Sequence, residues 1–134
     1  MTAVLPSRAS GAETASTAPD AETVYRPGVP IDLAGTLAPL GRGPYDPTTT
    51  WDAGGLWRTW RTPEGAATIR IRRAPAEGGI AAAAWGPGAG WAIAQFPELL
   101  GRGDDWSGLD AGRHPLLRDS LHRNPGLRLA KTGR

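Results

Sequence analysis

The centre of the chain alternates between apolar and polar side chains with a period of two, and this pattern most restricts the possible folds. Over residues 67–73, Ala and Ile alternate with Thr and Arg. A strand that is buried on one face and wet on the other has this pattern. Comparable segments surround it, and Gly-containing turns separate them. The four predicted strands are residues 48–51, 56–62, 67–73 and 80–85. They predict an antiparallel meander with one face exposed to solvent.

Helical spacing replaces the alternation on both sides of the predicted meander. Before it, Asp32 is a predicted N-cap for a short helix over residues 33–40, which Gly41 ends. After it, apolar residues recur at helical spacing from Ala92 to Leu100. Pro97 is expected to break this second helix in two.

A last helix is predicted from about His114 to His122, with Leu117 and Leu121 one turn apart. Asn124-Pro125-Gly126 ends it. Helices that cover one face of an antiparallel sheet of four or five strands make an α+β domain. The sequence predicts that fold class for residues 23–124.

The first 22 residues differ in composition from the rest. Residues 1–22 are mostly Ala, Ser, Thr, Glu and Pro, with few large apolar side chains. Such a segment buries too little surface to offset the entropy lost on ordering, so a disordered tail is expected.

Composition excludes several kinds of site. The 134 residues suffice for one domain. Cysteine is absent, which rules out disulfides, thiolate zinc sites and a Cys nucleophile, and suits a reducing cytoplasm. No apolar run is long enough to predict a membrane span, and no signal peptide is recognisable. We therefore expect a cytoplasmic monomer without a membrane partner.

Few residues suggest catalysis. His114 and His122 lack further metal ligands at fitting spacing, so surface or capping roles are expected. Ser120 lies on a different helix face from His122, which argues against a nucleophile and base pair. Asp104-Asp105 follows Gly103 and reads as a loop or an N-cap. We expect no catalytic residue, no metal and no cofactor in this chain.

Two Gly-rich patterns invite a nucleic-acid or phosphate interpretation. Residues 86–90 follow a strand and precede a helix, but they lack a Gly-Lys-Ser/Thr sequence, so a tight sheet-to-helix connection is the preferred interpretation. Leu-Gly-Arg-Gly at residues 40–43 and 100–103 resembles the hairpin of a helix-hairpin-helix module. Neither is followed by an amphipathic helix, so both are rejected.

Basic residues give two candidate anion-binding surfaces. The third predicted strand carries Arg70, Arg72 and Arg73, which either contact phosphates or form a solvated outer face. From Arg113 to Arg134 there are six basic residues against one acidic residue. The candidates there for the DNA backbone are Arg123, Arg128, Lys131 and Arg134.

The same residues, taken in order, resemble the alkylbase DNA glycosylase family (DNA-3-methyladenine glycosylase II). The similarity covers residues 25–134 and is carried by the stretches RPGVPIDL and TLAPL, WRTWRTPEG with ATIRI, AWGPGA with LLG and DD, and HPL with PGLRL and TG. The resemblance implies a TATA-binding-protein-like antiparallel sheet with helices. It also implies excision of alkylated bases such as 3-methyladenine from double-stranded DNA by nucleotide flipping and N-glycosidic hydrolysis.

In that family, catalysis belongs to a helix-hairpin-helix domain that follows the N-terminal domain. This sequence lacks that region, so no catalytic residue is carried over, and residues 125–134 are expected to be a connector to it. The first hypothesis is therefore an inactive N-terminal domain of a base-excision-repair glycosylase, with its own catalytic domain as a partner. The alternatives are a standalone nucleic-acid-binding module and a protein-interaction module with an exposed apolar face.

Overall fold

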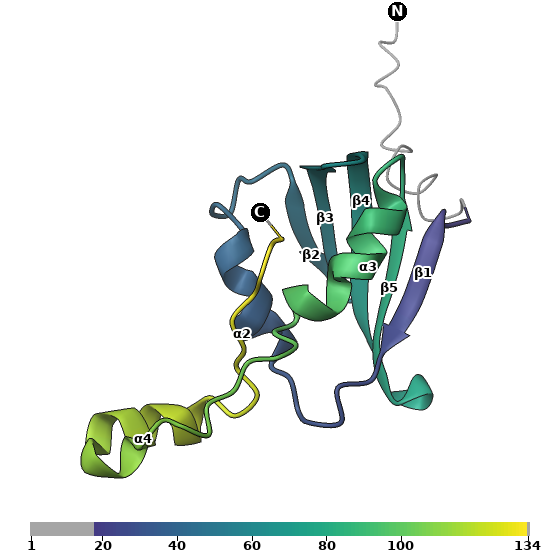
Figure 1. Ribbon diagram of the computed structural model, residues 1–134. Helices are drawn as coiled ribbons and strands as arrows, with labels where there is room; N and C mark the ends of the chain where they lie inside the picture. The colour runs from purple at the N-terminus through teal and green to yellow at the C-terminus, as the bar shows by residue number, and fades with distance from the viewer. Residues whose placement is uncertain (1–17, 134) are drawn as a thin grey trace, which may run out of the picture.

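The computed structural model describes residues 18–133 and contains one sheet of five strands (Figure 1). The strands are β1 (Ala21–Tyr25), β2 (Thr49–Asp52), β3 (Gly55–Thr62), β4 (Gly65–Ala74) and β5 (Gly79–Trp85). Their order in the sheet is β1-β5-β4-β3-β2, and all neighbours are antiparallel. The helices are α2 (Leu33–Leu37), α3 (Ala89–Leu99) and α4 (Pro115–Arg123), with 3-10 turns η1 (Ala38–Leu40), η2 (Pro75–Glu77) and η3 (Ala111–Arg113). The predicted α+β class is confirmed.

Strands β2 to β5 form the predicted meander, and their alternation decides which face is buried. In β4, Ala67, Ile69 and Ile71 are buried beneath the helices, whereas the residues between them point to the open face. The β2–β3 turn lies close against β4 because Gly55, at φ +136°, has no side chain to collide with the Ile71 carbonyl.

Strand β5 forms although it is rich in Ala, which has a low β-propensity. Small side chains suit this strand because it lies inside the sheet and is covered by a helix. Ala82 and Ala84 are buried on the face that α3 covers. Ala89 and Ala92 of α3 are buried as well. Small residues on both elements let the helix approach the sheet closely.

Strand β1 corrects the predicted start of the domain. The disordered tail was expected to extend through residue 22, but Ala21 and Glu22 belong to β1 and pair with Ala84 and Ala83 of β5. Residues 1–17 of the predicted tail lie outside the described residues. The edge strand was missed because its five residues gain their hydrogen bonds from a partner about sixty residues away.

Pro97 does not break α3 in two, contrary to the prediction. The helix runs without interruption from Ala89 to Leu99, with Pro97 in its last turn. A proline there removes one backbone hydrogen bond near a helix end, where few turns remain to be disrupted. The Leu100 amide still donates to the Phe96 carbonyl over 3.2 Å. Gly101, at φ +80°, follows the helix end.

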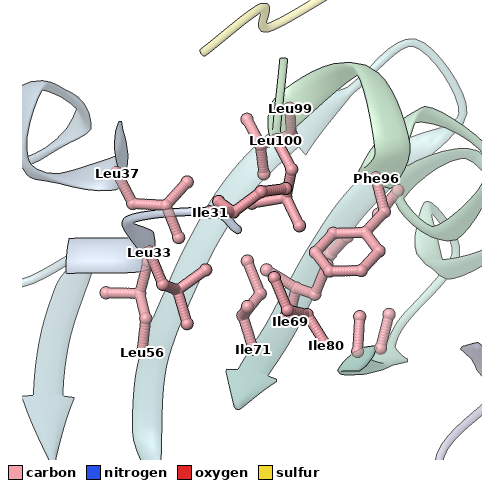
Figure 2. Packing of buried hydrophobic residues seen from close by; sticks show 14 of the residues in the cluster. Ile31, Leu33, Leu37, Leu56, Ile69, Ile71, Ile80, Phe96, Leu99 and Leu100 are labelled. Carbon is pink, nitrogen blue, oxygen red and sulfur yellow. The ribbon is translucent and has the colours of Figure 1, made fainter. Parts of the chain in front are cut away.

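The core lies between the sheet and the helices α2 and α3. Asp32 caps α2 as predicted, because its Oδ1 accepts a hydrogen bond from the Gly35 amide over 3.0 Å. Large apolar side chains from the sheet, the helices and their connections meet beneath α3 (Figure 2). Those with under 2% exposure include Leu37, Leu56, Ile69, Ile71, Phe96 and Leu100. Helix α4 stands away from this core (Figure 1). None of the helices between residues 18 and 133 is long and apolar enough to cross a bilayer.

Candidate functional site

Residues 126–133 have no regular secondary structure, yet they lie along the domain near α2 and α3 (Figure 1). The Asp32 amide donates to the Gly126 carbonyl over 2.8 Å, and the Arg128 amide donates to Thr36 Oγ1 over 3.1 Å. Thr36 is buried, so this hydrogen bond satisfies a hydroxyl in the core. The described part of the predicted connector is therefore attached to the domain, and where it leads stays a prediction.

Asp104 fixes the same segment from the loop that follows α3. Its carboxylate accepts a hydrogen bond from the Leu129 amide over 2.8 Å and forms an ion pair with Lys131 Nζ at 3.1 Å. Burial raises the pKa of Asp104, but the Leu129 hydrogen bond and the Lys131 ammonium outweigh it and hold this pKa below its ordinary value. Asp105 is exposed and accepts a hydrogen bond from the Ser107 amide, as a loop residue would. The carboxylate pair is structural.

The four basic residues predicted to attract DNA have different environments. Arg123 forms an ion pair with Asp119 one turn earlier in α4, and Lys131 is paired as described above. No ion pair joins Arg128 to another residue between 18 and 133. Arg134 lies outside the described residues. The structure thus compensates the charge of two of the three described candidates.

The open face of the sheet carries arginines that are also paired. Arg70 lies 5.0 Å from the Trp57 ring centroid and 3.7 Å from Asp52. Arg72 lies 3.7 Å from Glu77. These contacts keep both guanidinium groups against the protein and reduce the net charge of this face. They agree with the solvated outer face among the two interpretations that the sequence left open.

Arg73 does not share that face, which corrects the predicted cluster. Arg70 and Arg72 are two positions apart and point to the same side, but Arg73 is one position further and points to the helix side. Its Nη2 donates to the Ile31 carbonyl over 2.9 Å. Arg73 therefore fastens the segment before α2 to the sheet.

The histidines do not assemble a site with their neighbours. His114 is the N-cap residue of α4 but makes no side-chain capping bond, and His122 lies in the last turn of that helix. Both side chains are exposed. Within residues 18–133, no three His, Cys, Asp or Glu side chains are grouped so that they could hold a metal ion. The exposure of both side chains agrees with the surface role expected from the sequence, whereas neither His114 nor His122 makes a side-chain capping hydrogen bond.

Residues 86–90 form a tight connection, as preferred from the sequence, rather than an open phosphate loop. The Gly88 amide donates to the Ala66 carbonyl over 2.9 Å, and the Gly86 amide donates to Asp20 Oδ2 over 2.7 Å. A side chain at position 88 would collide with Thr62 Oγ1. These amides are occupied by the protein itself and do not face solvent as an anion site requires.

An exposed apolar groove of about 330 Å³ lies between α4, the loop after α3 and the turn after α4. We call it the α4 groove. Its apolar residues each expose two fifths or more of their surface: Trp106, Leu109, Leu117, Leu121 and Leu127. Scattered apolar residues are normal on a surface, but five around one groove indicate a binding surface.

The sequence of α4 explains why this groove is apolar. Leu117 and Leu121 are four positions apart and form a stripe, as predicted, while Arg118 and Asp119 point elsewhere. No residue of α4 is buried. The stripe faces Trp106 and its neighbours instead of the sheet. Sequence reasoning missed Trp106 and Leu109, whose only signal is two large apolar residues in a segment without helical or strand periodicity.

No protein-family model, curated protein or solved structure matches this chain. The site must therefore be interpreted from its own chemistry. The apolar groove offers contact area and a shape for side chains of another protein, but no acid, base or nucleophile lines it in a catalytic arrangement. Its apolar lining favours association with another protein.

Proposed function

We propose that this chain is the N-terminal, non-catalytic domain of an alkylbase DNA glycosylase, and that the α4 groove is where it meets a helical catalytic domain. The observation that carries the proposal is the apolar stripe of α4, with Leu117 45% and Leu121 41% exposed. Amphipathic helices bind grooves of this kind through apolar side chains at helical spacing. A helical domain is therefore a fitting occupant.

Two further observations support the proposal. The residues that resemble the glycosylase family cover positions 25–134, so they include every described helix and strand after β1. The five-stranded sheet with helices on one face is an architecture that this resemblance implies. The absence of Cys suits activity of such a protein in a reducing cytoplasm.

The alternative of a standalone nucleic-acid-binding module has weaker support. It requires free positive charge near the end of the chain, because counterion release by Lys and Arg provides most non-specific affinity. Arg123 and Lys131 are instead held in ion pairs with Asp119 and Asp104. An apolar groove is also a poor surface for a polyanion.

The first test is enzymatic. The purified chain is incubated with DNA that contains 3-methyladenine, and released base is measured by chromatography. We expect no release above the spontaneous rate, because no described residue is placed as a general acid or base. Release that depends on the chain would contradict the assignment of catalysis to another domain.

The second test measures association. A purified helix-hairpin-helix domain of an alkylbase glycosylase is titrated with this chain, and complex formation is followed by sedimentation. We expect Leu117→Glu to weaken the complex at least about tenfold, since it places a charge in the apolar contact. Leu116→Glu is the matched control, because Leu116 is on the same helix, 85% exposed and outside the groove. Equal loss with both variants, or no complex at all, would contradict the proposed role of the groove.

A further inference from the structure

A second cleft, of about 750 Å³, lies between the loop before β2, strand β3 and the C-terminal half of α3. We call it the β3 cleft. Its lining includes three arginines and two aromatic residues: Arg42, Arg58, Arg61, Tyr45 and Trp60. Its volume falls within the range of about 300–1,000 Å³ that is usual for small-molecule sites.

The cleft exists because the sheet and the helices leave one corner of β3 uncovered. Strand β2 pairs with β3 only as far as Arg58, and Pro47 stands just before the strand begins. The main contacts of α3 are with β1, β4 and β5, so β3 lies at the margin of this helix. Trp60 remains half-buried, with part of its ring in the wall of the cleft.

The lining of the cleft holds more arginines than carboxylates, and its one carboxylate is committed to the loop before β2. Asp46 accepts hydrogen bonds from the Thr48 hydroxyl over 2.6 Å and from the Arg42 amide over 3.0 Å. The Thr48 hydroxyl and these amides lower the pKa of Asp46 to about 2, so it stays ionised and is not available as an acid. The lining therefore contains three guanidinium groups and one carboxylate.

The arginines of the cleft differ in the contacts that they make with the protein. Arg58 is positioned by the protein: its Nη1 donates to the Leu40 carbonyl over 2.7 Å and to Thr49 Oγ1 over 3.2 Å, and its guanidinium lies 5.8 Å from the Trp60 ring centroid. No ion pair joins Arg42 to another residue in the described range. Arg42 is therefore the group best able to bind an anion.

Two aromatic side chains, Tyr45 and Trp60, also line the cleft. Tyr45 is 94% exposed, on the loop that also carries Arg42, and its ring has no cover within the described residues. Trp60 lines the same cleft from β3. Planar ligands stack on such rings, and arginine binds phosphate through two parallel N–H groups.

We propose that the β3 cleft binds a nucleobase that is joined to a phosphate, with the base against Tyr45 and Trp60 and the phosphate at Arg42. The ligand is either a free nucleoside monophosphate or the 5′-phosphorylated end of a nucleic-acid strand. The open face of the sheet lacks this combination because its arginines are paired, and the α4 groove is apolar. The inference does not rest on the proposed function, because the two surfaces share no residue.

The test is a titration of the full chain with deoxyadenosine 5′-monophosphate, followed by backbone and indole NMR resonances. We expect shifts confined to residues 42–48 and 58–61, and binding about tenfold weaker for deoxyadenosine, which lacks the phosphate. Arg42→Gln and Tyr45→Ala should each weaken binding several-fold. Both side chains are exposed, so thermal melts should show that the variants fold.

Arg118→Gln is the matched control, because it removes one exposed guanidinium on α4, away from the cleft. A 5′-phosphorylated tetranucleotide and its unphosphorylated form separate the two sources of ligand. Tighter binding of the phosphorylated strand than of the mononucleotide supports a strand end, and the reverse supports a free nucleotide. Equal affinity for deoxyadenosine and its monophosphate, an equal effect of Arg118→Gln, or no binding at millimolar ligand would overturn the proposal.

Discussion

Asp104 and Lys131 form an ion pair, with 3.1 Å between Oδ1 and Nζ, that joins the loop after α3 to the last segment of the chain. The Asp104 side chain is only 8% exposed, whereas that of Lys131 is 42% exposed. The same carboxylate holds the Leu129 amide. One buried carboxylate therefore makes two of the contacts that hold residues 126–133 against the domain.

Replacing Asp104 by Asn should loosen this segment around Leu129 and Lys131. The substitution keeps the size of the side chain but removes the charge that strengthens both contacts, so we expect a loss of about 1 kcal/mol in the free energy of unfolding. Urea unfolding measures the loss, and hydrogen exchange at the Leu129 amide locates it. Asp105→Asn is the control, since Asp105 is exposed and contacts only its own loop. Equal effects of the two variants would show that the anchor is not Asp104.

The same anchor should weaken in acid. The pKa of Asp104 is lower in the folded state than its ordinary value of 3.8. A lowered carboxyl pKa gives stability that is complete above the unfolded pKa and is lost as the pH falls through the folded one. We expect the protection of the Leu129 amide to fall below about pH 4, relative to the rest of the domain. In Asp104→Asn this extra loss should be absent; the same pH profile in that variant would assign the effect to another group.

Phe96 should be among the most costly core residues to truncate. It is fully buried, and its ring meets that of Tyr25 edge to face at 6.4 Å. Phe96→Ala removes this contact and leaves a cavity between α3 and the sheet, so we expect a loss of about 3–5 kcal/mol in unfolding free energy. Chemical denaturation measures it. A loss under about 1 kcal/mol would mean that α3 does not pack on the sheet as described.

Two neighbouring glycines provide a sharper test of the connection between β5 and α3. A Cβ at position 88 collides with Thr62 Oγ1, whereas a Cβ at position 90 meets nothing within 4 Å. We expect Gly88→Ala to cost about 1–3 kcal/mol from forced backbone shifts. Gly90→Ala should stabilise α3 by up to about 1 kcal/mol. Thermal melts of the pair check both signs, and similar melting temperatures would contradict the tight connection.

The sequence predicted the parts of the fold that depend on local pattern. The period of two in β4 requires its Ile residues to share one face, and the Gly turns around it define the meander. By the same alternation, Arg72 and Arg73 are successive strand residues and must point to opposite faces of the sheet. Strand β1 was missed because its partner lies far away in the chain, and Pro97 was misjudged because its effect depends on its distance from the helix end.

The candidate surfaces were only partly predictable. The stripe of Leu117 and Leu121 is visible in the sequence, but whether it packs on the sheet depends on where the loop after α3 directs α4. The β3 cleft depends on how far β2 extends along β3, which no local pattern specifies. The charge of the chain end was visible too, but its compensation by Asp104 was not, because that carboxylate comes from another element.

We propose that the α4 groove receives a helical glycosylase domain. Hydrogen exchange with mass spectrometry, on this chain with and without such a domain, tests it most directly. We predict slower exchange over residues 106–128, which carry the groove, and unchanged exchange in the strands of the open sheet face. Protection of the sheet strands with none at residues 106–128 would contradict the claim.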